Sequence, residues 1–187
     1  MADPYVHGYH PRESTRLQDQ AATLVDLLHS DTTYPPGSLV LEAGCGVGAQ
    51  TLPLAKNSPG STIIALEISR PSAAEARGRA ETAGIGNVRV LQGDIFRLPF
   101  RKESFDHLFV CFVLEHLPKP VEALTILKEF IKPGGTITAI EGVREAALAA
   151  GLMGEEEFDR GVCDLYRTAE EDGVFCYTFF KATGKKG

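Results

Sequence analysis

Apolar residues recur along this chain with two periods, and their alternation outlines the fold. Spacings of three and four, typical of an amphipathic helix, begin after Ser14 and fade by Asp31. Short apolar runs rich in β-branched residues, typical of buried strands, then alternate with helical stretches. Strands are predicted at 38–42, 62–67, 88–91, 105–112 and 136–140. Helices are predicted at 49–56, at 121–130, and from an N-cap at Ser69, with Pro71 in the first turn, to a stop at Gly84.

Strands that alternate with helices imply right-handed crossovers and therefore an α/β, doubly wound, mostly parallel sheet. Ligands bind such a sheet beyond the carboxyl ends of its strands, where the strand order reverses. After Glu141 the pattern changes: helices are predicted at 143–151 and 155–172, and then a strand at 174–181 with a frayed tail. We expect one domain in three parts, an N-terminal segment 1–35, a core 36–142 and a C-terminal part 143–187.

Composition and charge narrow the choice of partners. The chain has 187 residues, of which 43% are hydrophobic and 24% charged, as in a soluble globular domain. The net charge of −6 without a basic stripe argues against nucleic acid and anionic membranes. No apolar run approaches the roughly 18 residues of a membrane span, and the N-terminus does not resemble a secretory signal. We therefore expect a cytoplasmic protein.

Cysteine and histidine spacing gives no metal site. The four cysteines are far apart with no CxxC pair, so reduced thiols are expected rather than zinc ligands or disulfides. His7 and His10 lack a third ligand nearby in the sequence and are interpreted as surface residues.

A glycine-rich loop, GCGVGA at 44–49, follows the first predicted strand. It fits the dinucleotide pattern GxGxxA, and equally a GxGxG pattern preceded by the acidic Glu42. Glu67 ends the second strand about 20 residues later, where a carboxylate can accept hydrogen bonds from ribose hydroxyls. The alternative for Glu67 is a solvated carboxylate at a strand end. This region alone leaves a dinucleotide and another adenosine cofactor open.

The stretch after the third strand adds groups suited to adenine. Asp94 can accept a hydrogen bond from the adenine amino group while the next backbone N–H donates to the ring. Ile68 and Ile95 could lie against the two faces of the base.

Five stretches in order resemble the class I S-adenosylmethionine-dependent methyltransferases, in particular the small-molecule enzymes grouped with quinone biosynthesis. They are EAGCGVG, ALEIS, QGDIFRLPF, FDHLFVCFVLEHL and LKEFIKPGG, between Pro36 and Gly142. The resemblance implies a Rossmann-like sheet, S-adenosylmethionine as cofactor, S-adenosylhomocysteine as product, and methyl transfer to oxygen, sulfur or nitrogen of a small organic acceptor. A nicotinamide-dependent oxidoreductase ranks far below it.

The resemblance also implies roles for single residues. Glu67 would bind the ribose, and Cys111 would face the methionine backbone unless it only packs in the core. The segment 5–20 resembles the lid helix of the family, in which Tyr9, Arg16 and Gln20 could close over the donor or simply pack and face solvent. The remaining cofactor-binding candidates are Glu42, Gly44, Cys45, Gly46 and Gly48 for the methionine part, and Ile68, Asp94 and Ile95 for adenine.

His116, which follows Glu115 after the fourth strand, is the one catalytic candidate. Histidine titrates nearest to neutral pH and can serve as a general base, which is needed only if the acceptor arrives protonated. The alternative is that His116 only shapes the crevice.

The C-terminal part departs from the family pattern. The family follows its fifth strand with a helix, a sixth strand and an antiparallel seventh, whereas only the strand at 174–181 is found here and no sixth is evident. A natural deletion, an engineered shortening or missing residues near Glu141 would each explain this. The last strand would then be an exposed edge, so we expect a homodimer or a covering helix. Because this region shapes the acceptor pocket in the family, a donor-binding protein without transferase activity is the alternative function.

Overall fold

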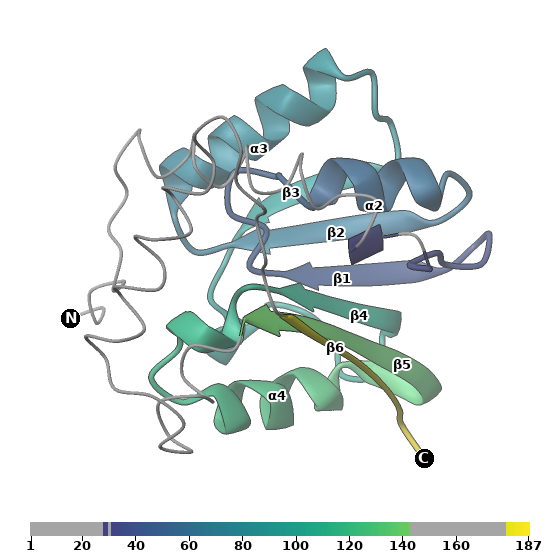
Figure 1. The fold of residues 1–187 in the computed structure, drawn as a ribbon, viewed down its shortest axis with the longest axis vertical. Helices are drawn as coiled ribbons and strands as arrows, with labels where there is room; N and C mark the ends of the chain where they lie inside the picture. Colours follow the sequence, from purple (N-terminus) through teal and green to yellow (C-terminus); the bar gives the residue numbers. More distant parts are fainter. Residues whose placement is uncertain (1–27, 30, 143–178) are drawn as a thin grey trace, which may run out of the picture.

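A computed structural model describes residues 28–29, 31–142 and 179–187. These residues form one six-stranded sheet in the order β3-β2-β1-β4-β5-β6 (Figure 1). All neighbouring strands are parallel except β6, which is antiparallel to β5. The strands are β1 Leu39–Ala43, β2 Thr62–Glu67, β3 Val88–Gln92, β4 Phe105–Cys111, β5 Ile131–Gly142 and β6 Phe179–Lys185. The expected mostly parallel sheet with one antiparallel C-terminal strand is confirmed, and its strand order reverses between β1 and β4.

The helices pack on both faces of this sheet (Figure 1), because strand residues alternate between the faces. On β1, Val40 packs in one apolar cluster with α2, whereas Leu41 packs in another with α4 on the opposite face. The α-helices are α2 Thr51–Asn57, α3 Arg70–Thr82 and α4 Pro120–Glu129, and two 3-10 turns are η1 Ile95–Arg97 and η2 Leu114–His116. None of the helices in the described part of the chain has the length and apolarity needed to cross a bilayer.

The predicted elements from 38 to 130 agree with the structure to within two residues at their starts. The start of α3 follows the sequence signals: the Ser69 side chain caps the helix by accepting from Ser72 N–H, and a proline lies in the first turn. At the end of α3, Gly84 has a φ of +66°.

Two predicted details at the sheet edge were wrong. The fifth strand was predicted to begin at Thr136, but β5 begins at Ile131, and its register with β4 shifts between Phe105 and His107. Gly135 makes this possible, because a Cβ there would lie 2.4 Å from the carbonyl oxygen of Asp106. The tail was expected to fray, but Gly184 pairs with Ile137 of β5.

Several sequence predictions lie outside the described residues. These are the helices at 143–151 and 155–172, the first part of the strand expected at 174–181, and the lid segment 5–20 with Tyr9, Arg16 and Gln20.

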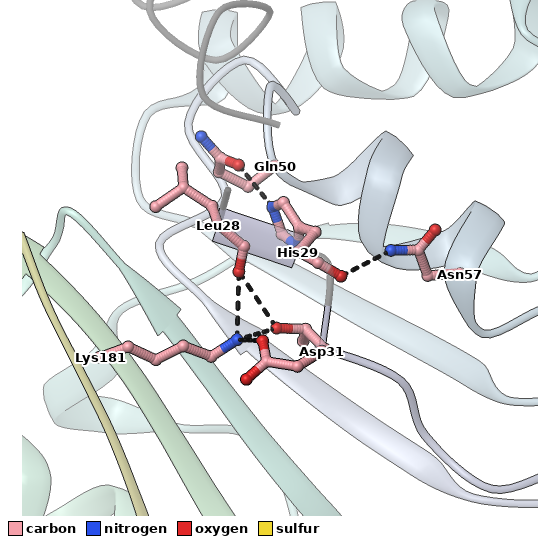
Figure 2. A network of polar contacts seen from close by, with 7 residues as sticks. Leu28, His29, Asp31, Gln50, Asn57 and Lys181 are labelled. Carbon is pink, nitrogen blue, oxygen red and sulfur yellow. Dashed lines mark hydrogen bonds and ion pairs between the residues drawn. The ribbon is translucent and has the colours of Figure 1, made fainter. Parts of the chain in front are cut away.

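A polar network joins the strand β6 to the residues that precede β1 (Figure 2). The ammonium group of Lys181 donates to the carbonyl oxygen of Leu28 at 3.1 Å and also contacts the Asp31 carboxylate and the Thr32 hydroxyl. The Lys181 side chain is 19% exposed, so these contacts are partly screened from water.

His29 connects the same residues to α2. Its side chain is 1% exposed, and its Nε2 lies 2.7 Å from Oε1 of Gln50, the residue before α2 (Figure 2). Asn57, at the other end of α2, donates to the carbonyl oxygen of His29 at 3.0 Å. Burial lowers the pKa of His29, so the ring is neutral at neutral pH. His29 thus contacts both ends of α2, while Leu28, Asp31 and Thr32 contact Lys181 of β6.

Candidate functional site

The glycine loop leaves the carboxyl end of β1 in a conformation that requires glycine. Gly44, Gly46 and Gly48 have φ values of +81°, +54° and +82°. Space is also limiting, because a Cβ on Gly44 would lie 2.6 Å from Cγ2 of Val113 and one on Gly48 would lie 3.1 Å from Cα of Ala76. The loop therefore packs directly against α3 and against the segment after β4, with no room for larger residues at positions 44 and 48.

Glu67, the last residue of β2, is attached to this loop. Its Oε2 accepts a hydrogen bond from Gly46 N–H at 2.9 Å, and its Oε1 accepts one from Ser69 N–H at 2.8 Å. Burial raises the pKa of the carboxyl group, and the backbone N–H donors act in the opposite direction. Each carboxylate oxygen retains a second lone pair for another donor. Glu67 therefore orients the loop and can still accept bonds from a ligand.

Glu42, within β1, lies beneath the loop and is 2% exposed. Its Oε2 and the Oγ1 of Thr51 are both buried and lack a hydrogen-bond partner. Burial raises the pKa of Glu42 to about 7, the neighbouring Thr51 side chain acts in the opposite direction, and the nearby charge of Glu67 adds to the rise. A buried carboxylate oxygen without a donor is costly in a folded protein, which marks this position as a candidate for contact with a ligand or an ordered water.

The predicted adenine-binding residues lie at the ends of β2 and β3. The backbone N–H of Gly93 donates to the carbonyl oxygen of Glu67 at 2.9 Å, which holds the loop after β3 beside the end of β2. Asp94 then caps η1, with its Oδ1 accepting from Phe96 N–H at 2.8 Å. Ile95 is 9% exposed and belongs to the core, whereas Ile68 is 51% exposed. Of the two isoleucines, only Ile68 offers a free apolar surface to a base.

The two cysteines of the candidate site, the buried Cys45 and the partly buried Cys111, are not nucleophiles. Burial raises the pKa of Cys45, and it raises the pKa of Cys111 well above the ordinary range. Both thiols are therefore neutral at physiological pH, and only a thiolate is strongly nucleophilic. Cys111 ends β4 and packs against the cluster formed by Val40, Phe109 and their neighbours.

His116 lies in η2, just beyond the carboxyl end of β4. Its Nε2 is 3.4 Å from Oε1 of Glu115, and the two side chains are 14% and 21% exposed. Because β1 and β4 are neighbouring parallel strands, the pair lies at the same end of the sheet as the glycine loop.

Sequence reasoning missed Glu141, which lies near the end of β5. Its carboxylate accepts from the backbone N–H groups of Val113, Leu114 and Glu115 at 3.1 to 3.4 Å. The available signal was an acidic residue directly after an apolar strand, the same signal that identified Glu67.

Two surface hollows among the described residues lie elsewhere. One is lined by Leu52 of α2 and by Glu75 and Arg79 of α3, and the other by the ends of the same two helices and Asn87. Neither involves the carboxyl ends of the strands, where the predicted site residues gather. No group of three or more His, Cys, Asp or Glu suited to a metal ion occurs among the residues that the structure describes.

The architecture and the loop together define a class of protein: an α/β nucleotide-binding fold with a glycine loop after β1 and an acidic residue after β2. The chain matches the family described as "Methyltransferase domain" over residues 41–139, just over half of its length. It therefore belongs to this family, the S-adenosylmethionine-dependent methyltransferases, as its sequence resemblance predicted.

Relatives and solved structures agree with this assignment. The chain is 32% identical over 106 residues to demethylmenaquinone methyltransferase of Staphylococcus aureus, covering 56% of this chain and 43% of that protein. It thus spans less than half the length of the curated relatives it matches. Its fold resembles a SAM-dependent methyltransferase from Aquifex aeolicus, with a TM-score of 0.64, 22% identity and coverage of 72% of this chain and 74% of that one. It also resembles coclaurine N-methyltransferase bound to N-methylheliamine and S-adenosylhomocysteine, with a TM-score of 0.57, 24% identity and coverage of 65% and 35%.

Proposed function

We propose that this chain binds S-adenosylmethionine at the carboxyl ends of β1, β2 and β3 and transfers its methyl group to a small organic acceptor. The bond between Gly46 N–H and Glu67 Oε2 carries the proposal, because it couples the glycine loop to the strand-end carboxylate. Glu42 and the loop residues Gly44, Cys45, Gly46 and Gly48 would hold the methionine part, and Glu67 would bind the ribose. The side chain of Ile68 would lie against adenine, while Asp94 and the backbone N–H of Ile95 would bind its edge. Cys111 would lie beside the methionine backbone and Tyr9 in the lid.

Several observations fit this cofactor. Glu42 offers a buried carboxylate oxygen without a donor beneath the loop, which suits a cationic or N–H group of the methionine part. The exposed side chain of Ile68 directly follows Glu67, so a base next to a bound ribose would find an apolar surface. Neither Cys45 nor Cys111 competes as a methyl acceptor, because both thiols are protonated.

Bound S-adenosylmethionine supplies an activated methyl group, because a sulfonium is a good leaving group. The residues of the chain then have to align donor and acceptor, which in favourable cases lowers a barrier by on the order of 7 to 11 kcal/mol. For an acceptor that arrives protonated, His116 is the candidate base, and its contact with Glu115 would orient the ring.

A small organic acceptor is supported by the name of the similar Staphylococcus aureus enzyme, demethylmenaquinone methyltransferase. The attacking atom, oxygen, sulfur or nitrogen, follows from the acceptor. Because the match covers only 43% of that enzyme, the second candidate function is a protein that binds S-adenosylmethionine or S-adenosylhomocysteine without transferring the methyl group.

The edge strand β6 is relevant to whether two copies of the protein associate. It is the last strand of the sheet in the described residues, and exposed edges favour association with another strand. A homodimer through this edge stays a prediction, which the oligomeric state in solution tests.

Calorimetric titration with S-adenosylmethionine, S-adenosylhomocysteine and NAD tests the cofactor. We expect both sulfur compounds to bind and NAD not to bind. Glu67→Ala should weaken binding about tenfold or more, because it removes a charged acceptor. Glu103→Ala, which removes an exposed carboxylate paired with Lys186, is the control and should bind like the wild type. Binding of NAD alone would overturn the proposal, and a methyl-transfer assay over phenols, thiols and amines separates the two candidate functions.

A further inference from the structure

Four consecutive backbone N–H groups after β4 donate to two adjacent residues of β5. The acceptors are a main-chain carbonyl and a side-chain carboxylate, and each N–H of residues 112–115 is used once. The bonds run from Phe112 to the Ile140 carbonyl oxygen at 2.8 Å, from Val113 to Glu141 Oε1 at 3.3 Å, and from Leu114 and Glu115 to Glu141 Oε2 at 3.1 and 3.4 Å.

The backbone held by these bonds is strained. Phe112 has a φ of +54°, a region that residues with a side chain rarely adopt and that a bulky residue enters only at a cost. Such a conformation persists only where the surrounding structure enforces it. Here the enforcing contacts come from Ile140 on one side and from the Glu141 carboxylate on the other.

The strained segment also forms one wall of the glycine loop. The side chain of Val113 covers the Cα of Gly44 so closely that a Cβ on Gly44 would lie 2.6 and 2.9 Å from its two methyl groups. On its other side, the backbone N–H of Gly44 donates to the carbonyl oxygen of Leu66 at 2.8 Å. A displacement of Val113 would therefore free the loop on the side that faces β4.

We propose that Glu141 is a positioning residue: its carboxylate holds segment 112–115 against the glycine loop, and it thereby sets the affinity of the donor site without touching the donor. This inference rests on the proposed function, since it concerns the same loop. It also makes β5 part of the donor site, although β5 carries none of the residues that the resemblance assigns to the cofactor.

A carboxylate suits this role because it presents two oxygens with four lone pairs to three donors. Hydrogen bonds from N–H groups to a charged acceptor are stronger than those to a neutral one. Burial raises the pKa of Glu141 to about 7, while its three backbone N–H bonds act in the opposite direction and the charge of Glu115 adds to the rise. Glu141 is thus a partly desolvated carboxyl group, and the backbone N–H groups that donate to it all belong to residues 113–115.

Two substitutions separate positioning from general stability. Glu141→Ala removes all three bonds, whereas Glu141→Gln keeps one oxygen that can serve Leu114 and Glu115 and loses only the bond to Val113. Ile131→Val trims a fully buried side chain at the opposite end of the same strand and is the control for lost stability.

The measurements are calorimetric titration with S-adenosylhomocysteine and amide hydrogen exchange of residues 113–115. Glu141→Ala should weaken binding about tenfold and speed exchange at these amides, and Glu141→Gln should weaken it about threefold. Ile131→Val should lower the melting temperature and leave both measurements unchanged.

The outcomes distinguish this inference from the proposed function. If the wild type binds S-adenosylhomocysteine and Glu141→Ala or Glu141→Gln shows unaltered affinity and slow amide exchange, the positioning role is wrong and the function stands. If Ile131→Val weakens binding as much as Glu141→Ala, the effect is one of stability and the inference is again overturned. If the wild type does not bind, the proposed function fails, and the amide exchange of the free variants still decides whether Glu141 holds the segment.

Discussion

At the scale of single residues, two buried carboxyl groups decide how the glycine loop is supported. Glu67 has a backbone N–H donor on each oxygen, whereas Glu42 has an oxygen with none. Glu67 could be predicted from its place at a strand end, because that relation is local in sequence. That Oε2 of Glu42 is buried without a hydrogen-bond partner depends on tertiary packing, which the sequence pattern does not contain.

Replacement of Glu42 by Gln should make stability less dependent on pH. The pKa of Glu42 is raised from its ordinary 4.5 to about 7, so between these values the folded protein binds a proton that the unfolded chain has released. The stability of the wild type relative to Glu42→Gln should therefore fall as pH rises from about 4.5 to about 7, by at most about 3 kcal/mol.

Urea unfolding of both proteins at pH 5 and pH 8 measures this effect. The free energy of unfolding of the variant, relative to that of the wild type, should be higher at pH 8 than at pH 5. Its affinity for S-adenosylhomocysteine should be lower than that of the wild type. An equal stability difference at the two pH values would show that Glu42 is not buried as an acid.

At the scale of elements, α3 is positioned by its first turn and by its contact with the glycine loop. The N-cap of α3, Ser69, donates its backbone N–H to the carboxylate of Glu67. The end of β2, the candidate ligand residue and the start of α3 therefore lie within three consecutive residues. This is why the boundaries here were predicted well. The register shift between β4 and β5 was not predicted, because it depends on the close approach of Asp106 to Gly135 on the neighbouring strand.

Two glycines that contact or belong to α3 should respond to alanine in opposite ways. Gly48→Ala should destabilise the fold, because φ is +82° and the new Cβ would lie 3.1 Å from Ala76. Gly78→Ala should stabilise it by about 0.4 to 1 kcal/mol, because Gly78 lies inside the helix with open space around it.

Thermal unfolding of the two variants checks this pair. Gly78→Ala is the internal control for the substitution itself. A stable Gly48→Ala protein with unchanged affinity for S-adenosylhomocysteine would contradict the packing described for the loop.

At the scale of the whole molecule, hydrogen bonds join segments of the chain that are far apart in sequence. Lys181 of β6 donates to the carbonyl oxygen of Leu28 across a sequence separation of 153 residues. The next residue, His29, contacts Gln50, which directly precedes α2 (Figure 2). The part of the chain before β1 is thereby attached both to the edge of the sheet and to the helix that follows the glycine loop.

Replacement of Lys181 by Met should cost about 1 to 2 kcal/mol of the free energy of unfolding. The change keeps the apolar stem but removes the bonds to Leu28, Asp31 and Thr32. Lys185→Met on the same strand, where the side chain is exposed, is the control and should change stability little. Urea unfolding compares the two, and equal effects would mean that the network adds nothing beyond strand propensity.

Motif spacing and apolar periodicity were sufficient to predict the order and type of the elements from 38 to 140, the glycine loop, the acid at the end of β2 and the family to which the chain belongs. These features are local, because apolar periodicity and turn chemistry act over a few neighbouring residues. The three-dimensional fold was needed to show which backbone donors bind Glu141, that Phe112 has a positive φ, and that Lys181 contacts residues before β1. Those contacts join residues from about 26 to 153 positions apart, and they exist only once the strands have paired in their final order.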